Sequence, residues 1–444
     1  MTEQKQASIK KELKTYQLSY QKVGEPIVVN FRRLVPELKK NERYSHLIHS
    51  YPAKLLSNIP YYFLASDALC PKDGIVLDPF CGTGTVLLEA VLSGRNALGA
   101  DANPLAELIT SVKTTYISPK TLINTLTATL IRAKRHRKVA KHPDAVAVWY
   151  SSKSLKQLTN IQNSIAEIKD EQQREFFELC FSNVVRKVSY ADPSISVPVH
   201  WNPERFYSHP ERMNEVKKKL QQLQTVNVYD KFEIVCRSNI DRINTLKGQI
   251  RKGIAARFIS DDARKLGLEN NSVDLILTSP PYAGAQKYIR ASWLNLYWLN
   301  RVKLEDIRDL KTHNIGREDY KKDEIYESYT GIEAADTVLK ELYNSGNIKR
   351  AFLAANYINE MKVALDESYR VLRQGGYMVI VIGNNTVCKR QFNTQDYLTN
   401  YIVSKGMELQ YKLIDDIKSF GLMTKRNKTA DKITREWVIV LKKV

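Results

Sequence analysis

Apolar and amphipathic segments alternate near the start of the chain. Residues 74–78 and 96–101 are short apolar runs that predict buried strands, and residues 85–93 and 104–114 repeat apolar side chains at the spacing of a helix. Only short links separate these four segments. Strands and helices that alternate in this way are typical of a parallel sheet with crossover helices.

A long helical stretch then interrupts the alternation. Residues 118–250 show helical periodicity, are rich in lysine and arginine, and contain few strand-like runs. The alternation resumes with predicted strands at 257–260, 273–277 and 377–382, a predicted helix at 349–372 that residues 374–376 end, and a predicted antiparallel pair at 408–414 and 436–441. The pattern therefore predicts one α/β domain with a helical insertion.

These segments also predict the domain boundaries. We expect an irregular or partly helical lead-in at 1–43, a first half of the α/β domain at 44–117, the helical insertion at 118–255, and a second half at 256–444 that carries an irregular, tyrosine-rich stretch at 301–348. A chain of 444 residues has room for a domain of this kind.

Composition and charge narrow the class of protein. The chain has 43% apolar and 26% charged residues, close to the values of ordinary globular proteins, so it can form a sizeable core. Its formal net charge of +20 favours a polyanionic partner such as nucleic acid. A basic surface that only keeps the protein in solution is the alternative.

Several classes of protein are not expected from this sequence. The five cysteines show no paired CxxC spacing, which argues against a disulfide framework or a metal site. No apolar run approaches the roughly 18–20 residues that span a bilayer, and the polar N-terminus is unlike a secretory signal. We therefore expect a protein without metal or membrane association, in the cytoplasm or, in a eukaryote, the nucleus.

A glycine-containing loop follows the first predicted strand. Residues 78–85 read Asp-Pro-Phe-Cys-Gly-Thr-Gly-Thr, and Gly82 and Gly84 let the backbone turn tightly or approach a ligand. Asp101 ends the next strand, where a carboxylate can accept hydrogen bonds from ribose hydroxyls. Because no GxGxxG is present, a nucleoside joined to an amino acid fits better than a pyrophosphate; a purely structural turn is the alternative.

A second pair of carboxylates follows the strand predicted at 257–260. We choose Asp262 over Asp261 as an acceptor for an adenine amino group. Aspartate is also a frequent helix N-cap, so a cap for a turn at 263–268 remains open as the structural alternative.

The motif Thr278-Ser-Pro-Pro-Tyr282 directly follows a predicted strand. Its two prolines fix φ and remove two N–H donors, so the segment must leave the sheet as a stiff loop with free carbonyls. Those carbonyls and the Ser279 hydroxyl can hold both hydrogens of an amino group, and Tyr282 can stack on the base that carries it. Methylation of cytosine at carbon 5 is not expected, because it needs a cysteine nucleophile, usually in a Pro-Cys dipeptide, and the chain has none. Cys81 is interpreted as a packing residue.

With these motifs, residues 41–117 and 256–444 resemble the DNA amino-methyltransferases of restriction–modification systems, particularly the cytosine-N4 branch. Residues 78–85 are similar to the cofactor loop of that family, residues 278–282 to its [DNS]-P-P-[YFW] catalytic loop, and residues 49–54 to its segment around the methionine end of the cofactor. Tyr288 and Arg290 resemble the extended SPPY motif of the N4 branch, although Lys287 stands where aspartate is usual.

The resemblance implies a Rossmann-like methyltransferase fold, S-adenosyl-L-methionine as cofactor, and base flipping in double-stranded DNA. The implied catalytic residues are Ser279, Pro280, Pro281 and Tyr282, and the implied cofactor-binding residues are Tyr51, Lys54, Asp78, Phe80, Gly82, Gly84, Thr85, Asp101, Ala102, Asp262 and Thr278. Ser279 favours cytosine N4 over adenine N6 as the target.

The resemblance also suggests how DNA is recognised. It makes the insertion at 118–255 the expected target-recognition region, in which phosphate contacts are required to support base flipping. The candidate DNA contacts are Arg132, Arg135, Arg137, Arg186, Lys187, residues 217–219, residues 251–252, Tyr288 and Arg290, with a turn at 189–193 as a candidate near the flipped base. Each basic cluster alone is more often a solvated helix face than a DNA contact, but four such clusters within one insertion together favour DNA binding.

Two rival functions remain open from the sequence. An RNA N-methyltransferase would use a related catalytic loop, and a silent nucleic-acid-binding subunit of a defence complex would share the basic charge. Intact cofactor and catalytic motifs favour the enzyme over the silent subunit. The family resemblance further implies a prokaryotic, cytoplasmic, nucleoid-associated protein with a cognate restriction endonuclease as a candidate partner.

Overall fold

The protein is built around one large, mostly parallel sheet. The structure, a computed structural model, describes residues 3–38, 43–52, 54–136, 141–283, 288–318, 320–416 and 435–444. The sheet order is β1 (Ile27–Val29), β9 (Met407–Asp416), β10 (Arg435–Lys443), β6 (Leu372–Ile382), β5 (Val273–Thr278), β2 (Ile75–Asp78), β3 (Asn96–Ala100) and β4 (Ala256–Ser260). Only β10 runs antiparallel to its neighbours. The predicted Rossmann-like methyltransferase fold, with its antiparallel C-terminal pair, is confirmed.

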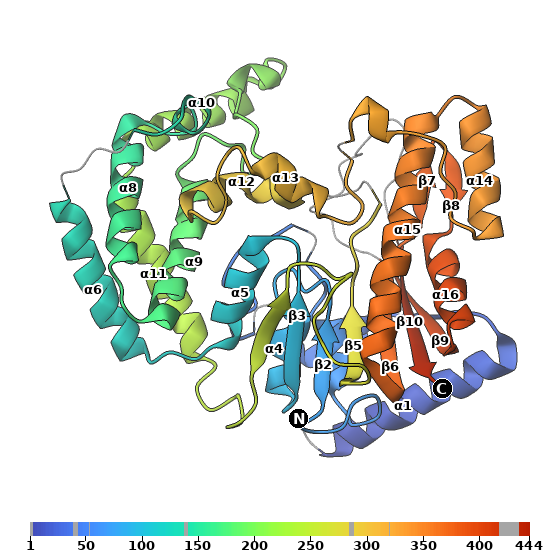
Figure 1. Ribbon diagram of the computed structural model, residues 1–444. Helices are drawn as coiled ribbons and strands as arrows, with labels where there is room; N and C mark the ends of the chain where they lie inside the picture. Colours follow the sequence, from blue (N-terminus) through green and yellow to red (C-terminus); the bar gives the residue numbers. More distant parts are fainter. Residues whose placement is uncertain are drawn as a thin grey trace.

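Helices cover both faces of the sheet (Figure 1). One face packs against α1 (Glu3–Val23), α2 (Phe31–Leu34), α3 (Asn58–Leu64), α4 (Thr85–Leu92) and α5 (Pro104–Thr114), and the other against α14 (Glu333–Asn344), α15 (Ile348–Val371) and α16 (Thr394–Ser404). Side chains of β5 alternate between the two cores, Leu275 and Leu277 on one side and Ile276 on the other. Burial on both faces explains the continuous apolar runs in the sequence.

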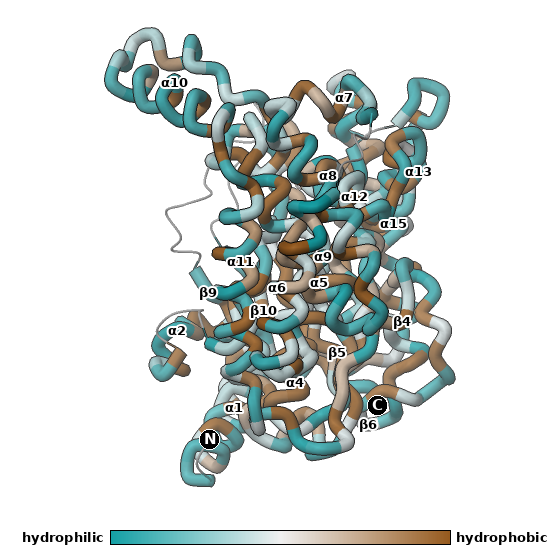
Figure 2. Tube along the Cα trace, turned by 90° about the vertical axis from the view of Figure 1, so that its left-hand side faces the viewer, coloured by the Kyte–Doolittle hydropathy of each residue, from teal (hydrophilic) through white to brown (hydrophobic). Residues whose placement is uncertain are grey.

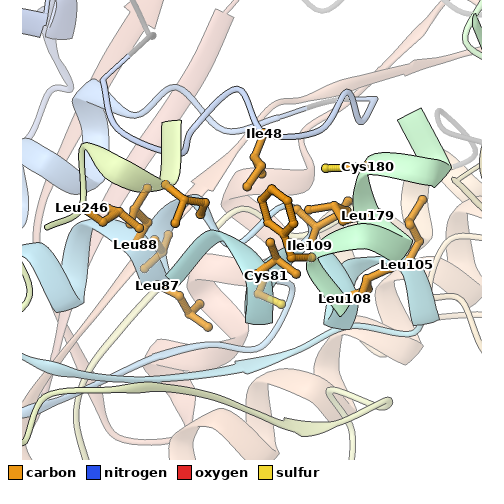
Figure 3. Close-up of a cluster of buried hydrophobic side chains, with 14 of the residues drawn as sticks. Ile48, Cys81, Leu87, Leu88, Leu105, Leu108, Ile109, Leu179, Cys180 and Leu246 are labelled. Atoms are coloured by element: carbon orange, nitrogen blue, oxygen red, sulfur yellow. The ribbon is translucent and has the colours of Figure 1, made fainter. Parts of the chain in front are cut away.

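The stretch predicted to be helical forms a separate layer beside the sheet. It contains α6 (Pro119–Arg135), α7 (Asp144–Ala147), α8 (Ser152–Ala166), α9 (Glu171–Lys187), α10 (Pro210–Thr225) and α11 (Val228–Asn244), which confirms its helical character. Figure 3 shows Cys81, Leu108 and Ile109 packed together with Leu179 of α9, so one core joins the insertion to the α/β domain. Cys81 is the packing residue that we expected, 5% exposed. In Figure 2, α10 projects from the body and is mostly hydrophilic.

The first residues of the chain belong to the fold rather than preceding it. Helix α1 buries Ile9 and Leu13 and packs along β9, where the Gln17 side chain donates a hydrogen bond to Gln410 at 2.6 Å. Strand β1 then pairs in parallel with the end of β9. The segment expected to be a lead-in therefore completes one edge of the sheet.

The second half differs from the expectation in two places. Residues 374–376 do not separate helix from strand, because β6 already begins at Leu372; Gly375 has φ +75°, and the register with β5 shifts there. The stretch at 301–348 contains α13 (Ile307–Thr312) and α14, preceded by α12 (Tyr288–Trp298), so it is less irregular than predicted. The hairpin of β7 (Asn385–Val387) and β8 (Arg390–Phe392) lies outside the main sheet.

Candidate functional site

The candidate site lies at the carboxyl ends of β2, β3, β4 and β5. The strand order reverses between β2 and β5, and ligands of open α/β sheets bind in the crevice at such a reversal. A cavity there encloses about 800 Å³, part of it open to solvent. Of the sequence-predicted residues, it brings together Tyr51, Lys54, Asp78, Phe80, Gly82, Thr85, Asp101, Ala102, Asp262, Ser279, Pro281 and Tyr288.

The glycine loop turns from β2 into α4. The Asp78 carboxylate accepts a hydrogen bond from the backbone N–H of Phe80 at 3.1 Å, which starts the turn. Gly84 caps α4 with φ +65°, and a Cβ there would lie 2.8 Å from the Thr110 hydroxyl oxygen. Glycine is therefore required at this position both by conformation and by space. Gly84 does not line the cavity but lets the loop close around it.

Asp101 presents a buried carboxylate to the cavity. Its two oxygens accept hydrogen bonds from the backbone N–H groups of Gly82 and Asn103, each at 2.9 Å. Burial raises its pKa to about 6. Each carboxylate oxygen can accept a second hydrogen bond, so a vicinal diol such as ribose would match this side chain.

Asp78 and Thr278 connect the glycine loop to the catalytic loop. The Thr278 hydroxyl donates a hydrogen bond of 2.6 Å to the Asp78 carboxylate, which is 3% exposed. Burial raises the pKa of Asp78 to about 7. Thr278 therefore lies behind the cavity wall, where it fixes the ends of β2 and β5 relative to one another.

The segment before α3 supplies an aromatic ring and a cation. The Tyr51 hydroxyl accepts a hydrogen bond from Asn103 at 3.0 Å, and its ring lies nearly parallel to that of Tyr288 with centroids 6.3 Å apart. The Lys54 ammonium donates to the carbonyl of His46 at 2.6 Å, and burial lowers its pKa to about 8. A cation at the cavity edge could bind the carboxylate of an amino acid.

Asp261 and Asp262 both line the cavity, so the structure does not separate the two as the sequence argument did. The Asp262 carboxylate accepts hydrogen bonds from the backbone N–H of Arg264 at 2.9 Å and from its guanidinium at 2.8 Å. No helix follows Asp262, because residues 263–264 form a turn and residues 265–268 have no regular structure. Asp262 does cap that turn, as the structural alternative expected, and it lines the cavity as well.

The catalytic loop leaves β5 as a stiff segment, but its carbonyls are not all free. The carbonyl of Pro281 accepts a hydrogen bond of 2.8 Å from the Tyr357 hydroxyl of α15. Within the described part of the chain, the carbonyl of Pro280 has no such partner. Ser279 lines the cavity, whereas Pro280 is buried and does not, so Ser279 is the residue of this pair that is placed to hold an amino group.

Tyr282 borders a second cavity that adjoins the first. This space of about 520 Å³, part of it open to solvent, is lined by Tyr282, Tyr288, Ile289, Arg290, Lys311, Asn314, Ile315, Gly316, Arg317 and Glu318. Tyr288, Asn314 and Ile315 line both cavities. We did not single out residues 311–318 from the sequence, because they carry no recognisable motif.

Two of the arginines proposed as DNA contacts hold the helical insertion together. The Arg186 guanidinium donates to the carbonyls of Ser196 and Ile195, at 3.0 and 2.5 Å, and so fixes a loop. Arg132 donates to the carbonyl of Ser164 at 3.1 Å and pairs with Glu167. Neither side chain is free to act only on a phosphate, since each satisfies buried or half-buried carbonyls.

The other candidate DNA contacts lie in different places. Arg135, Lys187, residues 217–219, residues 251–252 and Arg290 are exposed, whereas Arg137 and Lys287 lie outside the described residues. The end of α6 that carries Arg135 lies at the far side of the insertion from α15 in Figure 1. The turn at 189–193 pairs with His200 and lines neither cavity. Of the candidates within the described residues, Tyr288 and Arg290 share a cavity with Tyr282, and the others line neither cavity at the loop.

Among the residues that the structure describes, no helix is long and apolar enough to cross a membrane. In the same part of the chain, no cluster of three histidine, cysteine or acidic side chains could hold a metal ion.

Comparison with known proteins gives a consistent picture. Residues 2–110 match the family N6_N4_Mtase, described as DNA methylase. The chain is 24% identical over 366 residues, 77% of each protein, to the type II methyltransferase M.MvaI of Kocuria varians. It is 35% identical over 75 residues, 17% of this chain and 14% of the relative, to the type II methyltransferase M.MjaII of Methanocaldococcus jannaschii.

Solved structures give only a distant likeness. A S-adenosylmethionine-dependent methyltransferase from Methanosarcina mazei has a TM-score of 0.30 and 10% identity over 85% of this chain and 95% of that one. The rRNA methyltransferase aviRa of Streptomyces viridochromogenes has a TM-score of 0.27 and 12% identity over 89% of each chain. The matched family is a DNA methylase family and both curated relatives are type II methyltransferases, which agrees with the class of enzyme that the sequence motifs predicted.

Proposed function

We propose that the protein methylates the exocyclic N4 amine of cytosine in double-stranded DNA. The observation that carries this proposal is the position of the catalytic loop between two adjoining cavities. Ser279 and Pro281 line the first, and Tyr282 lines the second. A donor in one cavity and a base in the other would therefore meet at the segment from Ser279 to Tyr282.

The first cavity fits S-adenosylmethionine. Asp101 would accept the ribose hydroxyls, Asp262 or Asp261 the adenine amino group, and Lys54 would bind the methionine carboxylate. Buried carboxylates also suit a cationic sulfonium, since Asp78 and Asp101 face the same space. When bound, the cofactor supplies a methyl group on a positively charged sulfur.

The second cavity would hold the flipped base. Tyr282 and Tyr288 present aromatic surface there, and stacking on such rings is the usual way in which enzymes hold an unpaired base. The Ser279 hydroxyl would accept one hydrogen of the amine and a carbonyl of the loop the other, which would align the lone pair of the nitrogen with the first cavity. Catalysis would then rest on proximity, orientation and a preorganised polar environment.

The choice of cytosine rests on Ser279, because adenine-specific relatives more often carry aspartate or asparagine at this position. The helical insertion at 118–255 remains our proposal for target recognition, and a duplex is attracted by the net charge of +20. A swap of this insertion with that of a related enzyme should change the methylated sequence. An unchanged target would move recognition to residues 301–348.

The test is transfer of label from S-adenosylmethionine to mixed-sequence duplex DNA, followed by mass analysis of the nucleosides. We expect N4-methylcytosine. Label in N6-methyladenine would overturn the choice of base, and label only in RNA would overturn the choice of nucleic acid. A protein that binds DNA but transfers no label would be the silent subunit.

Asp101→Ala provides a control in the same assay. At limiting cofactor this variant should transfer far less label, because cofactor binding is weakened. Label transferred at the wild-type rate under those conditions would indicate a contaminating enzyme.

A further inference from the structure

We infer that Glu436, at the start of β10, is a positioning residue that holds the Tyr282 ring in the wall of the second cavity. The inference rests on the proposed function, because it assigns that ring to the target base. The Tyr282 hydroxyl donates a hydrogen bond of 2.6 Å to the Glu436 carboxylate, across 154 positions of sequence. No motif or curated relative described above assigns a role to Glu436.

Tyr282 needs an additional contact to fix its orientation, because its ring borders a cavity. Side chains packed on all sides keep their rotamer through contacts alone, but a ring that borders a cavity has no partner atoms on that side. Its orientation must then depend on its remaining contacts. A hydrogen bond to a carboxylate is short, directional and stronger than one between neutral groups. The phenol oxygen is therefore the natural point at which to hold the ring.

Glu436 is well suited to this task because it stands on a rigid element. Its neighbour Trp437 pairs with Ile382 of β6 on one side and Ile414 of β9 on the other, so the backbone is fixed within the sheet. Directly across the ladder from Glu436 lies Asp415, which is 5% exposed. Arg32 of α2 interacts electrostatically with both carboxylates and offsets their repulsion.

The hydrogen bond between Tyr282 and Glu436 is one of three that hold the loop in place. Thr278 is bonded to Asp78, the Pro281 carbonyl accepts from Tyr357, and Tyr282 donates to Glu436. The first two hold the backbone from β2 and α15. Only the third acts on the side chain that would contact the base. Loss of Glu436 should therefore change how the base is held, while the loop backbone keeps its place.

The experiment is a double-mutant cycle with Tyr282→Phe and Glu436→Ala, read as the single-turnover methylation rate and the cofactor Kd. We expect each single variant to lower the rate about 5- to 20-fold with the cofactor Kd unchanged within twofold. Because both remove the same bond, the double variant should be little slower than either single variant. Glu436→Gln keeps an acceptor oxygen and should recover part of the rate.

The matched control is Glu408→Gln, an exposed glutamate on the neighbouring strand β9, which should leave the rate unchanged. A wild-type rate in Glu436→Ala, or rate losses that multiply in the double variant, would overturn the inference. Should Glu436→Ala fail to fold, the Gln variant and Tyr282→Phe decide: equal rates to wild type in both would refute it. A wild-type protein that transfers no methyl group to DNA overturns the proposed function and this inference together.

Discussion

The two adjoining cavities are built in different ways. The carboxylates of the first come from the ends of neighbouring strands: Asp78 after β2, Asp101 after β3, and Asp261 and Asp262 after β4. The second cavity is formed by Tyr282, residues 288–290 and residues 311–318. The Tyr282 hydroxyl is hydrogen-bonded to Glu436 of β10. The first cavity thus follows from strand ends that any parallel sheet brings together, whereas the second depends on segments that meet only in the folded chain.

The two cavities also differ in the charge of the side chains that line them. Four carboxylates and one lysine line the first, which agrees with a cationic ligand. The second carries Arg290, Lys311 and Arg317 against Glu318 alone, which agrees with a segment of a polyanion. If this contrast reflects function, changes in the first cavity should alter cofactor affinity and changes in the second should alter methylation or DNA affinity.

The largest effect should come from Asp101→Ala. It removes acceptors for charge-assisted hydrogen bonds and leaves the N–H groups of Gly82 and Asn103 unpaired. We therefore expect the cofactor Kd to rise about 100-fold, which corresponds to a loss of roughly 3 kcal/mol of binding free energy. Titration calorimetry measures this directly. Asp230→Ala, at an exposed aspartate of α11 that lines neither cavity, is the matched control and should leave the Kd unchanged. Equal effects would show that Asp101 has no special role.

The next effect should come from Tyr282→Ala. Loss of base stacking is worth about 1–3 kcal/mol, so we expect methylation at limiting DNA to fall about 30-fold. The cofactor Kd should stay within twofold of the wild-type value, because Tyr282 does not line the first cavity. Collapse of cofactor binding in this variant would contradict the separation of the two cavities.

A smaller effect should come from pH. Burial raises the pKa of Asp101 to about 6, and hydrogen bonds from a bound ligand would stabilise the charged form and lower that pKa. Binding then releases a proton below the pKa of the free protein, so cofactor affinity should fall up to about fivefold between pH 6 and pH 5. Asp101→Asn should flatten this profile. An equally steep profile in that variant would assign the titration to another group.

The smallest effect should come from Arg290→Ala. An exposed arginine beside the second cavity that contacts one phosphate should lower DNA affinity about threefold and reduce the slope of log affinity against log salt by about one. Arg135→Ala, on the exposed end of α6, is the comparison. A larger loss in Arg135→Ala than in Arg290→Ala would place the main DNA contact on the insertion.

Local signals explain where the sequence prediction was accurate. The predicted helix at 104–114 has the bounds observed for α5, because Asn103 caps it by accepting from the N–H of Leu105 and Pro104 occupies its first turn. The predicted strands at 74–78 and 96–101 differ from β2 and β3 by one residue at one end each. Caps, prolines and strand-length apolar runs act within a few residues, so they can be read without the fold.

The features that the sequence did not reveal share a different cause. Arg132 and Arg186, which stay predicted DNA contacts, also donate hydrogen bonds to carbonyls from other parts of the insertion. The N-terminal residues read as a lead-in, but α1 and β1 find their apolar partners on β9, almost 400 residues away. A charged or weakly amphipathic segment does not specify its partner, because the partner is chosen by the packing of the whole domain.

The sequence by itself determined the parallel sheet, the glycine loop after β2, the stiff loop after β5 and the carboxylates at the strand ends. These follow from backbone preferences and hydrophobic periodicity, which are local properties of the chain. Only the tertiary structure decided that Pro281 gives its carbonyl to Tyr357, that residues 311–318 wall the second cavity and that Tyr282 is bonded to Glu436. Such contacts depend on how β10 and α15 pack against the loop, and no short-range pattern in the sequence predicts that packing.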